Sequence, residues 1–280
     1  MSNTPPPLFD RALGAERARR KRKAEPSILT TTIAEELAER LSFVNRRFAN
    51  ACLTAAEPEP IAARLKETGQ VVEIETRLPA AGDDLGLPRE RYDAMFSVLD
   101  LQGVNDVPGA LIQMRRALKP DGLLLACLFA GDTLTELRQS WLAAESRVTG
   151  GASPRVAPMI DVRELGALLQ RAGLALPVAD LDRTIVRYGD AVALIHEIGE
   201  LGLSNTLTGR ARRFTRREVM AAAVNHYQQN FADADGRIRA TVEIAWLTGW
   251  APHESQQKPQ KPGSAKARLA DALKVDEKKL

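Results

Sequence analysis

The stretch NACLTAAEPEPIAARL, from Asn50 to Leu65, decides the fold. Its apolar part, near Ala51–Thr54, predicts a short buried strand, and its end predicts a helix from about Pro58 to Thr68. A strand, a tight turn and a helix in this order often seat a nucleotide, because glycines in the turn let backbone N–H groups approach the ligand. Here the turn (residues 55–60) carries two alanines, two glutamates and two prolines, and no glycine. The frame of such a site is kept and its glycines are missing.

One helix is expected before this stretch, and strands and helices alternate after it. Nearly continuous apolar runs predict buried strands, and apolar residues at helical spacing predict amphipathic helices. Further strands are expected at Val71–Glu75, Tyr92–Asp100, Leu123–Phe129, Thr184–Tyr188 and, by period-two alternation, within Arg237–Trp250. Further helices are expected after Thr32, then at Pro108–Leu118, Thr133–Val148, Asp161–Gly173, Ala191–Leu201 and Thr215–Phe231.

Three Thr-x-x-Glu pairs have the spacing of a capping box, in which the two side chains satisfy N–H groups at a helix start. They predict helix N-termini at Thr32/Glu35, Thr133/Glu136 and Thr215/Glu218. KPDG (Lys119–Gly122) is expected to end a helix and turn the chain into the next strand.

The alternation of strands and helices predicts one doubly wound, Rossmann-like α/β domain over residues 27–251. A basic arm is expected at 1–26 and a polar tail at 252–280. Ligands of such sheets lie at the carboxyl ends of the strands. The positions to watch are therefore those that follow Thr54, Glu75, Asp100, Phe129 and Trp250.

Composition adds bounds on the class of protein. The formal net charge of +3 is too small to predict a nucleic-acid partner. The basic run within Glu16–Pro26 is either a solvated arm or helix face, or a contact for a polyanion or an anionic membrane surface. Cys52 and Cys127 lie in apolar runs and predict buried thiols in a reducing compartment, so we expect a cytoplasmic protein. No metal-ligand spacing, no apolar run of membrane-spanning length (~18 residues) and no signal-peptide core is visible.

Several longer motifs are similar to one family. They are LFDRAL near the start, VNDVPGALIQMRRALKPDGLLLACLFAGDTLTELR from Val104, GGASPRVAPM, LLQRAGL and WAPHESQQKP. Together they resemble one branch of the class I S-adenosylmethionine (SAM) methyltransferases. That branch includes the mitochondrial complex I assembly factor that hydroxylates an arginine, and bacterial malonyl-acyl-carrier-protein methyltransferase-like proteins. KPDG is shared by many methyltransferases, whereas GDTLTELR, GGASPR and HESQQKP together are specific.

The resemblance implies a seven-stranded sheet whose first strand feeds a loop of the LDLGxxxG type, which binds SAM. Without gaps, that pattern places Ala55 at the first glycine and Glu59 at the last. Glu75 would be the ribose-binding acid and Asp100 a further cofactor-side residue. Added Cβ atoms narrow the approach to the loop, prolines remove N–H donors, and glutamates place negative charge near the cofactor carboxylate. We therefore expect SAM binding to be impaired.

A second departure from the family concerns the sheet edge. About 16 residues separate Glu75 from Tyr92, where the family has a helix, a strand and a loop. A parallel crossover alone needs about a dozen residues or more. One edge strand and its helix are therefore expected to be absent or reduced, and with them the wall that holds adenine.

The catalytic candidates are Asn105, Asp132 and His253. Each has a structural alternative. Asn105, with the aspartate that follows it, can cap a helix, and Asp132 can belong to a capped helix start. His253 can be a hydrogen-bonded loop residue rather than a general base. Arg155 in GGASPR is either a loop anchor or a contact for an anionic or protein substrate.

Three functions follow as hypotheses. The first is a methyltransferase-fold protein that has lost ordinary SAM binding and acts through contacts with a protein partner, in assembly or regulation. The second is an enzyme that methylates or hydroxylates a protein or acyl-carrier substrate with a rearranged cofactor loop. The third, from the basic arm alone, is binding to an anionic membrane surface or RNA.

Overall fold

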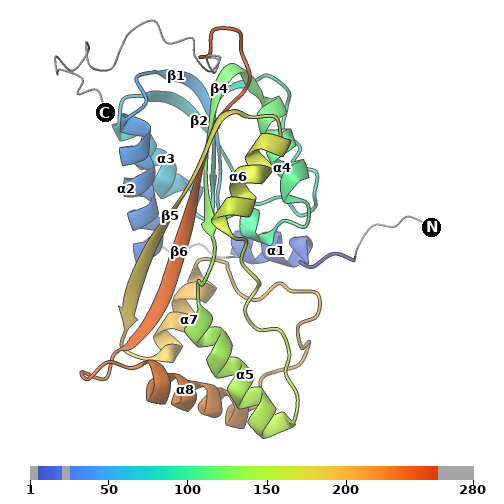
Figure 1. Cartoon of the computed structure of the whole chain (residues 1–280), viewed down its shortest axis with the longest axis vertical. Coiled ribbons are helices and arrows are strands. Elements are labelled where there is room, and N and C mark those ends of the chain that lie inside the picture. The colour runs from blue at the N-terminus through green and yellow to red at the C-terminus, as the bar shows by residue number, and fades with distance from the viewer. Residues whose placement is uncertain (1–5, 21–25, 258–280) are drawn as a thin grey trace, which may run out of the picture.

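The structure is a computed structural model of the chain and describes residues 6–20 and 26–257. One half is an α/β layer with helices on both faces of a sheet, and the other half packs three helices against the far end of two long antiparallel strands (Figure 1). The strands are β1 (Phe48–Thr54), β2 (Val71–Arg77), β3 (Tyr92–Val98), β4 (Leu118–Phe129), β5 (Ala175–Tyr188) and β6 (Ile238–Trp250). The helices are α1 (Arg11–Arg20), α2 (Ile28–Ser42), α3 (Pro58–Glu67), α4 (Val107–Ala117), α5 (Thr135–Thr149), α6 (Val162–Arg171), α7 (Ala191–Glu200) and α8 (Arg217–Phe231).

The six strands form one sheet in the order β2-β1-β3-β4-β6-β5. Strands β2, β1, β3 and β4 are parallel to one another, and β6 runs antiparallel to both of its neighbours. The predicted doubly wound, Rossmann-like α/β fold is confirmed. The segment 78–91, all of which the structure describes, contains no helix and no strand. The sheet therefore ends at β2, as the short interval between Glu75 and Tyr92 predicted.

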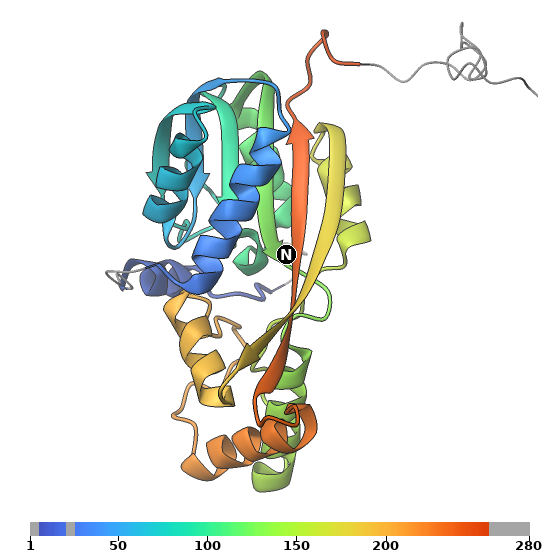
Figure 2. The same ribbon diagram turned by 90° about the vertical axis from the view of Figure 1, so that its left-hand side faces the viewer.

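Each face of the sheet buries its own apolar core. On one face α2 and α3 pack over β1 and β3, with Leu37, Leu53 and Ile61 at the centre. On the other face α4 and α6 cover β3, β4 and β6 (Figure 2). A third core joins α5, α7 and α8 to the first residues of β6, which runs through both halves. Burying a leucine or phenylalanine side chain contributes roughly 1.5–3 kcal/mol, so this third core attaches the second half to the sheet.

The helix starts differ from the predicted capping boxes because tertiary contacts compete for the same side chains. Helix α2 begins four residues before Thr32, where the Ser27 hydroxyl accepts the Thr30 N–H. Helix α5 has no side-chain cap. Instead Glu136 accepts the backbone N–H of Thr241 in β6 at 3.1 Å, together with its hydroxyl at 2.5 Å. These capping predictions were wrong although helices are present at all three places.

Helix α8 likewise has no side-chain cap, because the Thr215 hydroxyl accepts a hydrogen bond from Arg155. Two strands also begin earlier than predicted. Strand β4 includes KPDG, with Asp121 at φ 61°, and β5 starts at Ala175 instead of Thr184. The early part of β5 is an edge strand with polar and proline residues, which hides it from apolar periodicity.

Part of the predicted N-terminal arm (1–26) packs against the domain. Residues 11–20 form α1, with Arg11, Ala15 and Ala18 buried. Phe9 pairs with Leu207 in a short antiparallel bridge. The rest of the basic run and most of the predicted tail (252–280) lie outside the described residues. In the part of the chain that the structure describes, no helix combines the length and apolar character needed to cross a bilayer.

Candidate functional site

A cavity of about 160 Å³ lies at the carboxyl ends of the parallel strands. Its walls come from the turn after β1, the loops after β2, β3 and β4, helices α1 and α5, the loop after α5, and the segment that follows α7. The lining residues include Arg11, Pro79, Asp100, Gly103, Phe129 and Arg155. Parallel α/β sheets place their ligand sites at this edge.

Helix α1 closes the cavity with a buried ion pair. Arg11 Nη1 lies 3.3 Å from Asp100 Oδ1, and the two side chains are only 7% and 2% exposed. Arg11 Nε also donates to the carbonyl of Gly82, at 3.4 Å. Burial raises the pKa of Asp100 above its ordinary value, against the opposing effect of the Arg11 charge. The guanidinium therefore supplies the counter-charge at the end of β3.

The β1–α3 turn is tied into the protein's own backbone and side chains. The Ala55 N–H donates to the carbonyl of Arg77 at 3.2 Å, and Ala55 is buried. The Glu57 carboxylate accepts from the Thr30 hydroxyl and, at 3.5 Å, from the Ser27 N–H, so it faces the start of α2. Glu59 is exposed in the first turn of α3. Neither glutamate lines the cavity.

The shortened segment between β2 and β3 folds toward the same edge. Pro79 and Ala80 line the cavity, and Gly82 holds Arg11. Gln113 of α4 fixes the segment by accepting the Leu85 N–H at 2.8 Å and by donating to the carbonyl of Asp83 at 2.8 Å. This segment therefore covers the cavity, and the described residues contain no strand beyond β2 at this edge of the sheet.

The predicted ribose acid, Glu75, does not line the cavity. Strand β2 continues for two residues past it, and Glu75 accepts the Tyr92 hydroxyl at 2.8 Å. Burial and this hydrogen bond to a carboxylate raise the pKa of Tyr92. Arg91 lies 3.5 Å from the same carboxylate. Of the four predicted cofactor positions, Asp100 is the one whose side chain reaches the cavity.

The predicted catalytic residues are separated from one another. Asn105 brackets the backbone of Phe9, accepting its N–H at 2.8 Å and donating to its carbonyl at 3.1 Å. The Asp106 side chain, not Asn105, caps α4. The Asp132 side chain is 65% exposed and lies 3.8 Å from Arg183. Asn105 is thus a tether for the N-terminal segment, and Asp132 is a surface residue beside the cavity.

His253 lies at the opposite edge of the sheet. Because β6 is antiparallel, its C-terminal end pairs with the start of β4, and Ala251 exchanges backbone hydrogen bonds with the Asp121–Gly122 turn. The exposed His253 ring is 2.7 Å from the Ser255 hydroxyl. The position after Trp250 was predicted to lie with the other strand ends, and the antiparallel direction of β6 places it at the opposite edge of the sheet.

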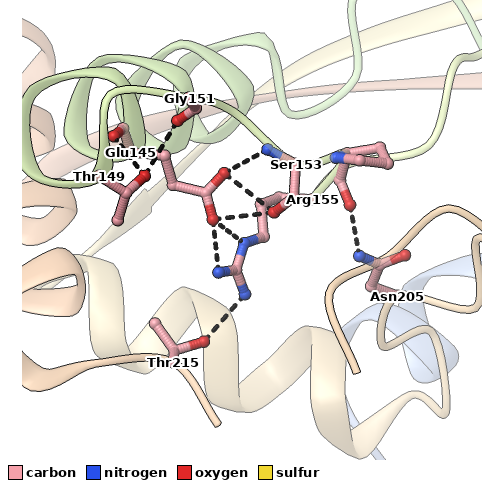
Figure 3. Close-up of polar contacts among 8 residues, drawn as sticks. Glu145, Thr149, Gly151, Ser153, Arg155, Asn205 and Thr215 are labelled. Carbon is pink, nitrogen blue, oxygen red and sulfur yellow. Dashed lines mark hydrogen bonds and ion pairs between the residues drawn. The ribbon is translucent and has the colours of Figure 1, made fainter. Parts of the chain in front are cut away.

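Arg155 anchors the GGASPR loop (Figure 3). It donates to Glu145 through Nε at 2.8 Å and through Nη2 at 2.5 Å, and to the Thr215 hydroxyl at 2.9 Å. Its guanidinium also lies 4.8 Å from the centre of the Trp141 ring. Burial alone would raise the pKa of Glu145, but the Ser153 N–H and Arg155 outweigh it and lower the pKa. The loop-anchor alternative accounts for every polar contact of this arginine.

Two buried charged residues at this end of the sheet were not predicted as site residues. Arg11 belongs to the predicted N-terminal arm, and its burial against Asp100 has no signal in local periodicity. Glu243 of β6 is buried and accepts the Asp132 N–H at 2.8 Å, because it stands directly beside Gly131.

Burial raises the pKa of Cys52 to about 11 and of Cys127 to about 12, so neither is an activated nucleophile. Within 6–20 and 26–257, no cluster of three or more His, Cys, Asp or Glu side chains could hold a metal ion.

Comparison with known proteins gives one family. A family model described as a methyltransferase domain matches residues 37–126. Arginine-hydroxylase NDUFAF5, mitochondrial, is 37% identical in Danio rerio over 66% of this chain and 57% of that protein. The Homo sapiens protein is 37% identical over 72% of this chain and 60% of that protein. The malonyl-[acyl-carrier protein] O-methyltransferase of Xylella fastidiosa (strain M23) is 34% identical over 57% of this chain and 52% of that protein.

The matched region spans little more than half the length of these curated relatives. Among solved structures, a Bacillus halodurans C-125 protein with a provisional methyltransferase assignment aligns with a TM-score of 0.50. It is 10% identical and covers 78% of this chain and 98% of that chain, which shows a shared fold alone.

Proposed function

Because the chain belongs to the class I SAM-dependent methyltransferase superfamily, in the branch of the arginine hydroxylase and malonyl-carrier methyltransferase relatives, we propose a non-catalytic function for it. On this proposal the protein does not bind SAM and acts through contacts with a protein partner, in the assembly or regulation of a larger complex. The cavity at the strand ends is then a remnant of a cofactor site.

One observation carries the proposal, namely the buried Arg11–Asp100 ion pair at the carboxyl end of β3. A cofactor in this position would have to displace α1 or share the cavity with a guanidinium that already has a buried counter-ion. Breaking such a pair costs about 3–5 kcal/mol, because the remaining charge is left uncompensated. The protein's own N-terminal helix therefore competes with any ligand.

The donors and the space for SAM are also reduced. In the turn after β1, the Ala55 N–H is already bonded and Pro58 and Pro60 have none to offer. The cavity of about 160 Å³ is about half the roughly 300 Å³ at which small-molecule sites begin. No strand beyond β2 is present in the described chain to form an adenine wall. We infer that these residues do not fit the cofactor.

Two further parts of the proposal concern where the protein acts and on what. The branch that this chain resembles includes the mitochondrial complex I assembly factor, and the relatives include a mitochondrial arginine hydroxylase, so the partner we propose is a subunit of a respiratory complex under assembly. Buried, unreactive thiols at Cys52 and Cys127 suit a reducing compartment, and we propose the cytoplasm.

A second candidate function is an enzyme of the same branch, and one observation favours it. Arg11 Nη2 is buried and has no hydrogen-bond partner within the described part of the chain. An unsatisfied buried donor costs about 1–3 kcal/mol, and a ligand oxygen in the adjoining cavity would satisfy it. A methyltransferase or hydroxylase with a rearranged cofactor loop would use the cavity in this way.

Filling the cavity distinguishes the two candidates. Gly103 lines it, and a Cβ at Gly103 would meet no atom within 4 Å. Gly103→Leu should therefore fold normally and block a ligand. Gly189→Leu is the matched control, since Gly189 is also open but lies at the start of α7, outside the cavity.

The assay is restoration of respiratory complex assembly, on native gels stained for NADH dehydrogenase activity, in a strain that lacks this protein. The proposal predicts that both variants restore assembly like the unaltered protein. Failure of Gly103→Leu alone, with normal circular dichroism, would establish a ligand-dependent function. A further pair, Ala55→Gly with Glu59→Gly, should create no measurable SAM binding, because the adenine wall and the α1 position are unchanged.

A further inference from the structure

The segment GRARRFTRR (Gly209–Arg217), here called the arginine loop, is the last part of the connection from α7 and ends on the first residue of α8. It carries five arginines and one phenylalanine, and Glu218 directly after it is the nearest acidic residue in the sequence. The loop belongs to the half of the molecule that holds α5, α7 and α8 (Figure 1). It plays no part in the cavity described above.

The tip of the arginine loop is fully open to solvent. Phe214 is 101% exposed, the largest value among the exposed apolar residues. Arg212, Arg213, Arg216 and Arg217 are exposed as well. None of the four forms an ion pair with a carboxylate in the described residues, in contrast to Arg183, Arg187 and Arg210. Positive charge and an apolar ring are thus presented together without an ion-paired carboxylate in the described residues, although the charge of Arg212 is felt by Asp10.

Both ends of the loop are anchored, which keeps this tip from folding back. At one end Arg210 lies 3.2 Å from Asp10 and donates to the Leu207 carbonyl at 2.9 Å. At the other end the Thr215 hydroxyl is held by Arg155 (Figure 3), and Val219 is buried in the core under α8. The exposure of Phe214 is therefore a built feature of the loop.

We propose that the arginine loop binds the surface of an anionic lipid bilayer. Guanidinium groups without an ion-paired carboxylate pair with lipid phosphates without breaking an existing ion pair. Phe214 enters the boundary between headgroups and acyl chains, where burial of its ring is favourable. In the sequence the arginine loop is distinct from the basic run within Glu16–Pro26, of which residues 21–25 lie outside the described chain.

The composition and charge of the loop favour a bilayer over nucleic acid. A phenylalanine has no polar group to satisfy and gains most from apolar surroundings. The whole chain has a formal net charge of only +3, which gives little long-range attraction to a polynucleotide. Binding to RNA is therefore the competing outcome of the test.

The test is cosedimentation of the full chain with vesicles of neutral phosphatidylcholine, or of phosphatidylcholine with about 30% phosphatidylglycerol. Each arginine near an anionic surface contributes about fivefold in partitioning, so Arg212→Gln with Arg213→Gln should lose roughly 30-fold. The matched control, Arg163→Gln with Arg171→Gln, removes the same charge from exposed positions of α6 and should lose less than about twofold.

Phe214→Ser should weaken binding at least about fivefold, whereas Phe43→Ser, at an 80% exposed position after α2, should not. Equal binding to neutral and anionic vesicles would overturn the proposal, and so would equal losses in the test and control pairs. Loss of binding only in a variant with Lys21, Arg22 and Lys23 changed to Gln would assign it to the N-terminal run instead. Binding to a single-stranded RNA oligonucleotide without vesicle binding would assign the loop to nucleic acid.

Discussion

Replacing Arg11 with methionine isolates the interaction on which the site depends. Methionine keeps an unbranched chain of similar reach and removes the charge. It leaves the Asp100 carboxylate, 2% exposed, without its counter-ion. The neighbouring contacts of α1, including buried Ala15 and Ala18, remain.

The magnitude follows from the geometry of the pair. At 3.3 Å and an effective dielectric constant of about 20, the attraction between the two charges is about 5 kcal/mol. Loss of one partner of a buried pair costs about 3–5 kcal/mol in measured cases, so Arg11→Met should lower the free energy of unfolding by that amount at pH 7.5. Adding Asp100→Leu to Arg11→Met should restore part of the loss, because no uncompensated charge is then buried.

The loss should depend on pH in a defined direction. Burial already raises the pKa of Asp100, and removal of Arg11 raises it further. A carboxyl whose pKa is higher in the folded state than in the unfolded state becomes protonated in the folded protein first as the pH falls. The penalty in Arg11→Met is therefore largest above the pKa of Asp100 in that variant, and it shrinks as the pH is lowered through that value.

Urea unfolding followed by circular dichroism measures these differences. Arg19→Met, at an exposed position of the same helix, is the control and should change stability by less than about 0.5 kcal/mol. A loss in Arg11→Met no larger than in this control would refute the reasoning. Additive effects of Arg11→Met and Asp100→Leu would refute it equally, since they would show that the two side chains do not interact.

Three further predictions concern other parts of the fold. Gly131→Ala should destabilise the protein by about 2–4 kcal/mol in thermal unfolding, because φ is +55° and the new Cβ would lie 1.8 Å from Glu243 Oε2; Gly151→Ala, with open space, is the control and should change little. Glu145→Gln should cost roughly 1.5–3 kcal/mol at pH 7. Since the folded-state pKa of Glu145 is lowered, the stability difference between the unaltered protein and Glu145→Gln is fully present above pH 4.5, the ordinary pKa, and vanishes as the pH falls through the lowered pKa. A loss of stability that does not depend on pH would contradict this account. Asn105→Ala removes both hydrogen bonds to the N-terminal segment and should speed proteolysis of that segment severalfold, while unchanged cleavage would show that other contacts hold it.

The sheet could be predicted because its strands carry strong local patterns. Tyr92–Val98 and Leu123–Phe129 are nearly continuous apolar runs, which indicate strands buried on both faces. The missing edge followed from chain length alone, since the interval before Tyr92 is too short for a parallel crossover. These signals depend on neighbours in the sequence and survive without tertiary information.

The site could not be predicted to the same extent because its contacts are long-range. Arg11 meets Asp100 across 89 residues, and nothing in LFDRAL indicates that its arginine is buried. Thr133 and Glu136 had the spacing of a capping box, yet β6 binds both side chains. The direction of β6 decided where His253 lies, and periodicity carries no information on strand direction.

The central claim is that the protein's own chain occupies the place of an adenosyl ligand. Isothermal titration of the full chain with S-adenosylhomocysteine and SAM tests it most directly, because it needs no substrate and no partner. The account predicts no saturable binding for either compound at millimolar concentrations. A dissociation constant in the micromolar range would contradict it and would make the chain a SAM-binding protein.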